Sequence, residues 1–323
     1  MKKKYYFNYG RSAFKYGLLS YNLNTKRKIL IPDFICNEIT NALDELSIPY
    51  IFYNLKDNLK PDWEELKKIK VSKCSAILMV HYFGNSQNIE KYINYAKENN
   101  LILIEDNAHG FSGKYKSKEM GTFGDFGISS PRKMMNNQYG GVLYKNTEVI
   151  NLIPIKKNFA ENIFALIFYL KNKPSLIKKS IKRNFMKRPV YEDPLAFKEK
   201  IYGIFKLDYI SYKMIKSKNL KNIKNIRMQI YNNWKIFADK KNLIPVYESL
   251  NQGSVPWCFP VYVSSDQERV DMLNWGWENK FSIFTWPSLP TEIIKDEGDG
   301  YKKWKKLICF STDPSNVHIK KYI

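Results

Sequence analysis

Two hydrophobic periodicities alternate along the first hundred residues of the chain. Short continuous apolar runs, such as KILIP, are separated by segments in which apolar residues recur with helical spacing. This alternation predicts a mostly parallel sheet flanked by helices and joined by right-handed crossovers. We expect helices over residues 12–21, 37–46, 62–69 and 89–99, and strands over residues 26–32, 50–53, 76–80 and 101–104.

The pattern changes after about residue 150. Residues 162–170 are markedly apolar, and residues 171–188 hold eight basic residues and no acid. We predict a large domain over 1–206, which includes a basic helical segment over 151–206, and a smaller α/β domain over 207–323. In the second half we expect a helical region over 208–235, a strand over 255–263, a helix over 267–275 and a strand over 307–310.

The chain is strongly basic, with 53 Lys and Arg against 31 Asp and Glu and a net charge of +22. Two interpretations stay open. One is that an AT-rich genome favours lysine codons, which gives a surface rich in lysine without a specific function. The other is attraction to anions such as nucleotide sugars, acidic lipid headgroups or nucleic acid. Because no nucleic-acid-binding motif accompanies the charge, we do not expect a nucleic-acid partner.

Cysteine and histidine usage limits the chemistry. The four cysteines are scattered without a CxxC pair, and only three histidines are present, so we expect free thiols in a reducing cytoplasm and no metal site. The first residues, MKKKYYFNYG, lack an apolar h-region, so we expect no signal peptide. No apolar run approaches the length of a membrane span.

Three polar residues lie just beyond the carboxyl ends of predicted strands: Asp33, His81 and Asp106. Ligands of open parallel sheets bind at the carboxyl ends of the strands, so these side chains are expected in one site. Lys133 follows in a turn of small and polar residues. A strand-end carboxylate and a loop lysine are two parts that an enzyme dependent on pyridoxal phosphate (PLP) needs. The lysine attaches the aldehyde, and the carboxylate pairs with the protonated ring nitrogen.

The order of the surrounding motifs adds a family resemblance. The chain shows His81-Tyr82-Phe83-Gly84, then Glu105-Asp106-Asn107-Ala108-His109, Gly121-Thr122-Phe123-Gly124-Asp125, Ser130-Pro131-Arg132-Lys133 and Gly140-Gly141. In this order the blocks resemble the DegT/StrS-type sugar aminotransferases of PLP fold type I. The resemblance covers residues 5–145 well and the rest loosely. It implies the fold type I transferase fold, an α/β fold with a mostly parallel central sheet and a smaller α/β C-terminal domain.

The resemblance also implies roles for individual residues. Lys133 would be the catalytic, cofactor-bound lysine, Asp106 the partner of the ring nitrogen, and His109 a neighbour of the phenolic oxygen. Arg11 and Ser12 would hold the phosphate at the start of the first helix. The turn before Lys133 is shorter than is usual in the family, so either Ser129 or Ser130 is the further phosphate contact.

The chain departs from the family at two places. Cys36 stands where the family has an aromatic residue that stacks on the PLP ring, and Phe34 is the alternative from a different direction. The family segment that reaches into the neighbouring subunit is missing, and residues 205–212 occupy its approximate position.

The implied activity is amino transfer, with glutamate as the expected donor, to the ketone of a nucleotide-linked sugar for glycan biosynthesis, in a cytoplasmic homodimer. Two alternatives stay open. The first is a PLP-dependent sugar dehydratase. Relatives with that activity carry His where this chain has Lys133, which argues against it. The second is a non-catalytic binding protein with a degenerate aminotransferase fold. Residues 162–188 are expected to be a core helix and a solvated helix, or else a weak contact to an anionic membrane surface.

Overall fold

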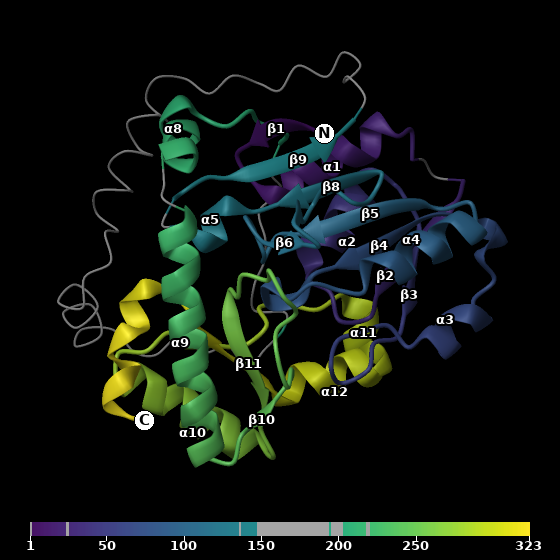
Figure 1. Cartoon of the computed structure of the whole chain (residues 1–323). Helices are drawn as coiled ribbons and strands as arrows, with labels where there is room; N and C mark the ends of the chain where they lie inside the picture. Colours follow the sequence, from purple (N-terminus) through teal and green to yellow (C-terminus); the bar gives the residue numbers. More distant parts are fainter. Residues whose placement is uncertain (1, 24–25, 136, 147–193, 195–202, 218–219) are drawn as a thin grey trace.

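The structure is a computed structural model that describes residues 2–23, 26–135, 137–146, 194, 203–217 and 220–323 (Figure 1). The expectations for the apolar stretch 162–170 and the basic stretch 171–188 therefore lie outside the described residues. In the part of the chain that is described, no helix is both long and apolar enough to cross a membrane.

A seven-stranded sheet with the order β1-β9-β8-β5-β4-β2-β3 forms the centre of the molecule. β3, β2, β4, β5 and β8 run parallel, while β9 is antiparallel to its neighbours β8 and β1. This confirms the predicted, mostly parallel sheet. Its strands are β1 (Lys3–Phe7), β2 (Lys28–Pro32), β3 (Tyr50–Tyr53), β4 (Cys74–Val80), β5 (Ile102–Asn107), β8 (Phe126–Ser129) and β9 (Gly141–Lys145).

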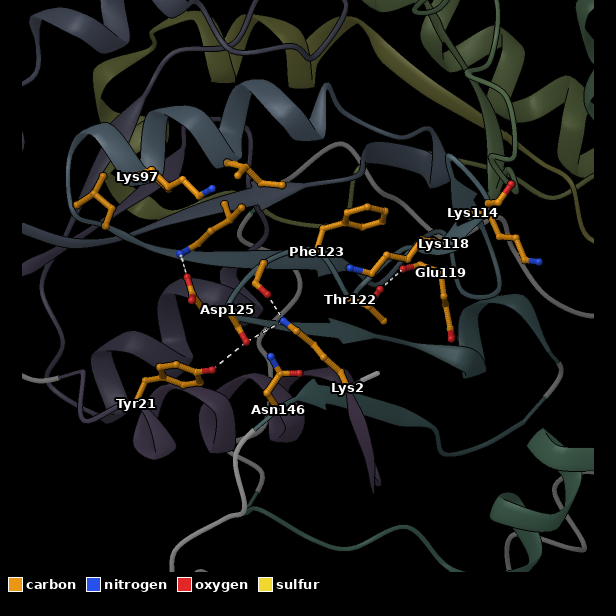
Figure 2. Close-up of a pocket in the computed structure, with 16 residues that line it drawn as sticks. Lys2, Tyr21, Lys97, Lys114, Lys118, Glu119, Thr122, Phe123, Asp125 and Asn146 are labelled. Atoms are coloured by element: carbon orange, nitrogen blue, oxygen red, sulfur yellow. Dashed lines mark hydrogen bonds between the residues drawn. The ribbon is translucent and has the colours of Figure 1, made fainter.

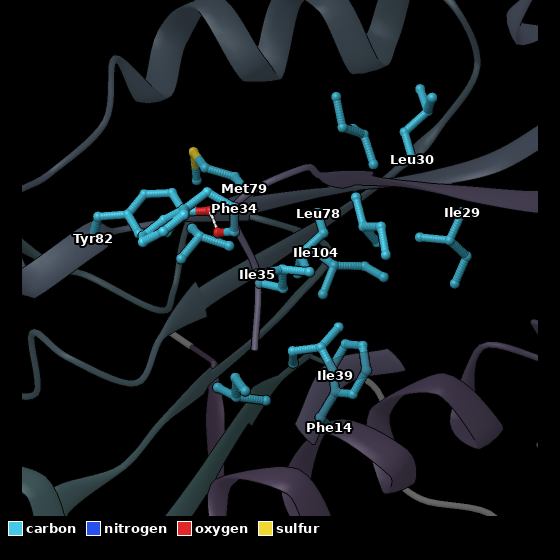
Figure 3. Close-up of a cluster of buried hydrophobic side chains, with 14 of the residues drawn as sticks. Phe14, Ile29, Leu30, Phe34, Ile35, Ile39, Leu78, Met79, Tyr82 and Ile104 are labelled. Carbon is cyan, nitrogen blue, oxygen red and sulfur yellow. Dashed lines mark hydrogen bonds between the residues drawn. The ribbon is translucent and has the colours of Figure 1, made fainter. Parts of the chain in front are cut away.

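Helices cover the sheet and bury its apolar residues (Figure 1). Phe14 and Ile39 from the first two helices meet strand residues such as Leu78 and Ile104 in one continuous core (Figure 3). Asp62 caps a short helix through its carboxylate, which accepts the N–H groups of Glu64 and Glu65, as its place in the sequence suggests. These helices are α1 (Gly10–Ser20), α2 (Asn37–Glu45), α3 (Trp63–Lys68), α4 (Ile89–Glu98) and α5 (Pro131–Met134).

The C-terminal part holds a four-stranded antiparallel sheet with the order β10-β11-β13-β12. The long helix α9 packs beside it, with Trp234 against Phe310 at 4.7 Å between ring centroids (Figure 1). The helical region expected over 208–235 is confirmed by α8 and α9. The elements are α8 (Tyr209–Ser217), α9 (Leu220–Lys240), β10 (Ile244–Pro245), β11 (Cys258–Tyr262), α10 (Asp266–Glu278), β12 (Ile283–Phe284), α11 (Thr291–Asp296), α12 (Asp299–Lys306) and β13 (Leu307–Ser311).

The two parts meet at the carboxyl end of β4. The 3-10 turn η2 (Tyr82–Gly84) follows that strand, and the segment before β11 lies against it. Gly84 O accepts the N–H of Val255 at 3.3 Å, and Phe83 O accepts the N–H of Trp257 at 2.8 Å. The C-terminal part therefore contacts the edge of the sheet at which the predicted site residues lie. The domain boundary between residues 206 and 207 stays a prediction.

Candidate active site

Asp106 lies near the end of β5, a central strand between β4 and β8. Its Oδ1 accepts the N–H of Ala108 at 2.8 Å, and its Oδ2 has no hydrogen bond within the described part of the chain. Burial raises the pKa of Asp106, while the Ala108 N–H and the charge of Lys133 act in the opposite direction. A buried carboxylate with one uncommitted oxygen is suited to pairing with a protonated ring nitrogen.

The preceding residue, Glu105, organises the backbone around the site. Its fully buried carboxylate accepts the N–H groups of Gly121 at 2.5 Å and Phe123 at 2.6 Å, and it lies 3.0 Å from Nε2 of His81. Burial alone would raise the pKa of Glu105, but the His81 contact and the backbone donors bring it below its usual value. The glutamate of this motif thus fixes both the glycine turn and His81.

The turn His81-Tyr82-Phe83-Gly84 sets the orientation of His109. Phe83 adopts a left-handed conformation with φ 55°, which is uncommon for a residue with a side chain, and directs its N–H to Nδ1 of His109 at 3.2 Å. Gly84 follows at φ 87°, where a Cβ atom would lie 2.0 Å from the carbonyl oxygen of Val255. The glycine is therefore required by close backbone approach as well as by its dihedral angles.

Lys133, in α5, reaches the other side of the same imidazole, with its Nζ 2.9 Å from Nε2 of His109. Burial, and then the charge of Lys133, hold the pKa of His109 well below its usual value, so the ring is neutral. Because Nδ1 accepts the Phe83 N–H, the single proton of the neutral ring belongs on Nε2. The contact with Nζ therefore joins the amine of Lys133 to the ring nitrogen that carries the proton.

Aromatic rings enclose this pair. His109 stacks between Phe83, with centroids 5.9 Å apart, and Trp257, with centroids 4.5 Å apart. Lys133 Nζ lies 5.0 Å from the centroid of the Trp257 ring. Trp286 stands edge-on to His109, and its buried Nε1 has no hydrogen-bond partner within the described residues. The sequence did not single out either tryptophan, because both belong to the half in which the family motifs are absent.

Arg227 is a third residue that the sequence did not single out. This buried guanidinium in α9 donates to Met134 O at 2.9 Å and to Thr312 Oγ1 at 2.9 Å, and it lies 3.4 Å from Trp257 O. Burial lowers the pKa of Arg227 to about 10. One side chain therefore joins the helix that carries Lys133 to the segment that carries Trp257.

Of the expected phosphate contacts, Arg11, Ser12 and Ser130 lie at the start of α1, and each already has a protein partner. Ser130 lies beside Gly10: a Cβ atom added to Gly10 would lie 3.6 Å from the Cβ atom of Ser130. The hydroxyl of Ser130 donates to Gly140 O at 3.4 Å. Ser12 donates to Gly203 O at 3.3 Å. Ser129 instead accepts from Asn107 Nδ2 at 3.2 Å, inside the protein. Ser130 is thus closer than Ser129 to the helix start that we expect to hold phosphate.

Two guanidinium groups flank this helix start. Those of Arg11 and Arg132 each lie 5.4 Å from the centroid of the Tyr9 ring, and Arg11 also pairs with Glu38 at 3.4 Å. Nε of Arg132 is buried without a hydrogen-bond partner among the described residues. The site thus offers positive charge for an anion such as phosphate.

Cys36, where the family has a stacking aromatic residue, is the N-cap residue of α2 and is partly buried. Phe34 is fully buried and packs against Trp286, with ring centroids 4.8 Å apart. Trp286 from the C-terminal part thus packs on Phe34, two residues before Cys36. Among the described residues, no group of three His, Cys, Asp or Glu side chains could hold a metal ion.

The donors and acceptors fit PLP: a lysine amine held against His109, a buried carboxylate with a free oxygen, and a helix start with cations and hydroxyl groups. The fold is that of the fold type I PLP-dependent transferases. Residues 6–153 match the model of the DegT/DnrJ/EryC1/StrS aminotransferase family, which confirms the resemblance expected from the sequence.

Individual relatives agree with this. A GDP-perosamine synthase of Escherichia coli O157:H7 is 28% identical over 147 residues, which are 44% of this chain and 40% of that protein. A UDP-4-amino-4,6-dideoxy-N-acetyl-beta-L-altrosamine transaminase of Campylobacter jejuni subsp. jejuni serotype O:23/36 (strain 81-176) is 31% identical over 113 residues, 33% of this chain and 30% of that protein. The match therefore spans less than half of these relatives.

Among solved structures, the Helicobacter pylori aminotransferase PseC, involved in the biosynthesis of pseudoaminic acid, superposes with a TM-score of 0.71. The superposition covers 99% of this chain and 85% of that chain, at 16% sequence identity. At that identity the likeness establishes the fold alone, and it extends over the C-terminal part that the family model does not match.

Proposed function

We propose that the protein is a PLP-dependent aminotransferase that transfers an amino group, with glutamate as donor, to the ketone of a nucleotide-linked sugar for glycan biosynthesis. The observation that carries the proposal is the contact of Lys133 Nζ with His109 Nε2 beside the free oxygen of Asp106. The names of the sugar aminotransferase relatives support the substrate class.

The residues of the site have separate tasks in this reaction. Lys133 would attach the cofactor, and Asp106 would keep a proton on its ring nitrogen. Arg11, Ser12 and Ser130 would hold the phosphate, and Cys36 would border the ring. When bound, PLP supplies an electron sink for the charge left at the α-carbon of the amino donor. The released Lys133 amine would take the proton from that α-carbon and return it during the second half of the reaction.

Water must be excluded from this site while the proton moves, and the aromatic rings stacked on His109 would provide the exclusion. His109 would donate its Nε2 proton to an oxygen or nitrogen at the place that Lys133 Nζ occupies. Lysine at position 133 also distinguishes this chain from the dehydratases expected to carry histidine there.

We further propose a cytoplasmic homodimer with paired sites, because fold type I sites are typically built at a dimer interface and twofold dimers are the commonest closed assembly. Light scattering with the active protein tests this assembly. A fully active monomer would contradict it.

The activity is tested with purified protein and PLP. We expect a visible absorbance band that bleaches with glutamate and returns with a keto acid, and then turnover of one member of a panel of keto-sugar nucleotides. Lys133→Ala protein is the matched control and is expected to show neither. Absence of a band in the wild-type protein would instead favour the non-catalytic binding protein.

A further inference from the structure

A second hollow, of about 820 Å³, lies between the loop after β3, the start of α4, the hairpin β6 (Lys114–Tyr115) and β7 (Lys118–Glu119), and the loop 251–253. None of Lys133, Asp106 and His109 lines it. Six lysines line it and no Asp or Glu does; we call it the lysine hollow. The six are Lys56, Lys60, Lys91, Lys114, Lys116 and Lys224.

Most of this charge is uncompensated. Lys116 pairs with Glu90 at 2.7 Å, and Lys91 lies over the ring of Trp63. The other four lysines form no ion pair within the described part of the chain. Charges of one sign gathered in a concave surface raise the local potential more than the same charges spread over a convex one. The lysine hollow is therefore an attractive position for an anion.

The loop that carries Lys56 and Lys60 is held in place. Gln87 Nε2 donates to Leu59 O at 2.9 Å and to Val80 O at 3.1 Å, which ties the loop to β4. Leu59 is fully buried at φ 56°, and Lys56 N donates to Lys60 O at 2.9 Å. The backbone of both lysines is thus fixed before any ligand arrives, so little ordering is needed on binding.

The opposite wall is fixed as well. Lys114 N donates to Gly253 O at 2.9 Å, which joins the hairpin to the C-terminal part. Gly253 has φ 85°, and a Cβ atom there would lie 2.3 Å from Lys114 O. Trp63 and Tyr115 add aromatic surface between the lysines. The hollow thus combines fixed cationic walls with flat apolar surface.

A larger cavity, of about 970 Å³, also borders the hairpin and shares Lys114 and Ser117 with the lysine hollow. Figure 2 shows the residues that line this cavity. It is less suited to an anion, because Glu119 and Asp125 line it. There Lys2 donates to the carbonyl oxygen of Asp125 at 2.8 Å, and burial lowers the pKa of Lys2 to about 8.

We propose that the lysine hollow binds the diphosphate group of a ligand. Ammonium groups on several sides of one cavity match a group that carries charge on several oxygens, and lysine binds phosphate as a point charge. The volume falls in the range of small-molecule sites and leaves room for a nucleoside beside the diphosphate. The proposal rests on the charge and shape of the hollow alone. Its test therefore does not depend on whether Lys133 holds the cofactor.

The test is calorimetric titration of the whole chain. The protein is first loaded with PLP, so that its cofactor phosphate site is filled, and is then dialysed to remove unbound PLP. The titrants are UDP, GDP, inorganic pyrophosphate and uridine, at low and at physiological salt. Tighter binding of UDP or GDP than of pyrophosphate would identify a nucleotide as the source of the diphosphate. Equal binding would identify the diphosphate alone.

The decisive variant is Lys56→Gln/Lys60→Gln, in which both changed residues are exposed. Lys320→Gln/Lys321→Gln is the matched control, since it removes the same charge from exposed residues outside the hollow. We expect Kd for the diphosphates to rise about tenfold or more in the first variant and less than about twofold in the control. Equal Kd values in the two variants, no binding by the wild-type protein, or uridine binding as tightly as UDP would overturn the proposal.

Discussion

Lys133 contacts one nitrogen of the His109 ring, and a third group holds the other nitrogen. Nζ of Lys133 lies 2.9 Å from Nε2 of the imidazole, while Nδ1 on the far side accepts the N–H of Phe83 at 3.2 Å. The strained turn before Gly84 thus determines which nitrogen of His109 carries the proton.

This relationship predicts the tautomer of His109. Nitrogen NMR should show a neutral ring protonated at Nε2, and the ring should stay neutral at the pH near 6.5 where a free imidazole is half protonated, because burial lowers the pKa of His109. The unfolded chain does take up this proton, so the stability that the neutral ring contributes is present above about pH 6.5 and declines as the pH falls below it. The His109 signal, assigned by its loss in His109→Gln, is the measurement. An Nδ1–H tautomer or a ring that titrates near pH 6.5 would contradict the assignment.

Replacing Lys133 should abolish the activity at its first step. Lys133→Ala removes the nucleophile, and Lys133→Arg replaces it with a guanidinium that stays protonated and cannot attach the cofactor. We expect neither variant to show the visible band or measurable amino transfer, while circular dichroism shows that both fold. Turnover by either variant would mean that another lysine holds the cofactor.

Asp106→Asn should separate cofactor binding from catalysis. The amide can still accept the N–H of Ala108, so the variant should fold and bind PLP, but it cannot hold a proton on the ring nitrogen by charge. Single-turnover rates with glutamate should fall by about two orders of magnitude or more. Near-normal rates would show that a different acid has this role.

Arg227 is predicted to be a positioning residue. Arg227→Met leaves Met134 O and Thr312 Oγ1 without their donor, so the free energy of unfolding should fall by about 2 kcal/mol or more. Arg227→Lys should restore little of it, since an ammonium lacks the planar fork that reaches both acceptors.

Denaturant unfolding and the kinetic constants for glutamate test this role. We expect kcat to fall in Arg227→Met because α5 carries Lys133. Lys240→Met, an exposed change on the same helix, is the control and should alter neither quantity. A normal kcat in a destabilised Arg227→Met protein would reduce Arg227 to a structural residue.

Asp33 should make stability depend on pH. Burial raises its pKa to about 6, partly offset by the charge of Lys303 and the N–H of Leu55. The folded protein therefore keeps a proton that the unfolded chain releases near pH 4. Its stabilising effect is complete below about pH 4 and is lost as the pH rises through about 6.

The comparison is between wild-type protein and Asp33→Asn, unfolded by urea across this range. The stability of the wild-type protein relative to the variant should fall by up to about 3 kcal/mol between pH 4 and pH 6 and then stay level. Asp239→Asn, at an exposed position, is the control. A constant difference between wild-type protein and Asp33→Asn across the range would show that Asp33 is ionised throughout.

The sequence was sufficient to predict β2, β3, β4 and β5, because each contains a short continuous apolar run of the kind that is buried in a parallel sheet. It did not predict β1, which reads as a charged N-terminal segment, or β8, whose four residues FGIS include a glycine and give too little periodicity. Lys133, Asp106 and His109 could be proposed because they lie within local motifs. Trp257, Trp286 and Arg227 could not, because their contacts with these residues arise only from the tertiary fold.

The stacking of Trp257 on His109 also has a consequence for protein synthesis. The ribosome releases Lys133, Asp106 and His109 well before Trp257, so a nascent chain that ends near residue 153 holds the recognisable motifs without the ring that covers the imidazole. Such an intermediate exposes apolar surface around Phe83 and depends on protection from aggregation until the last third emerges. A product cut short after the motifs is therefore expected to be a substrate for chaperones and proteases, although it contains every residue that the family motifs identify.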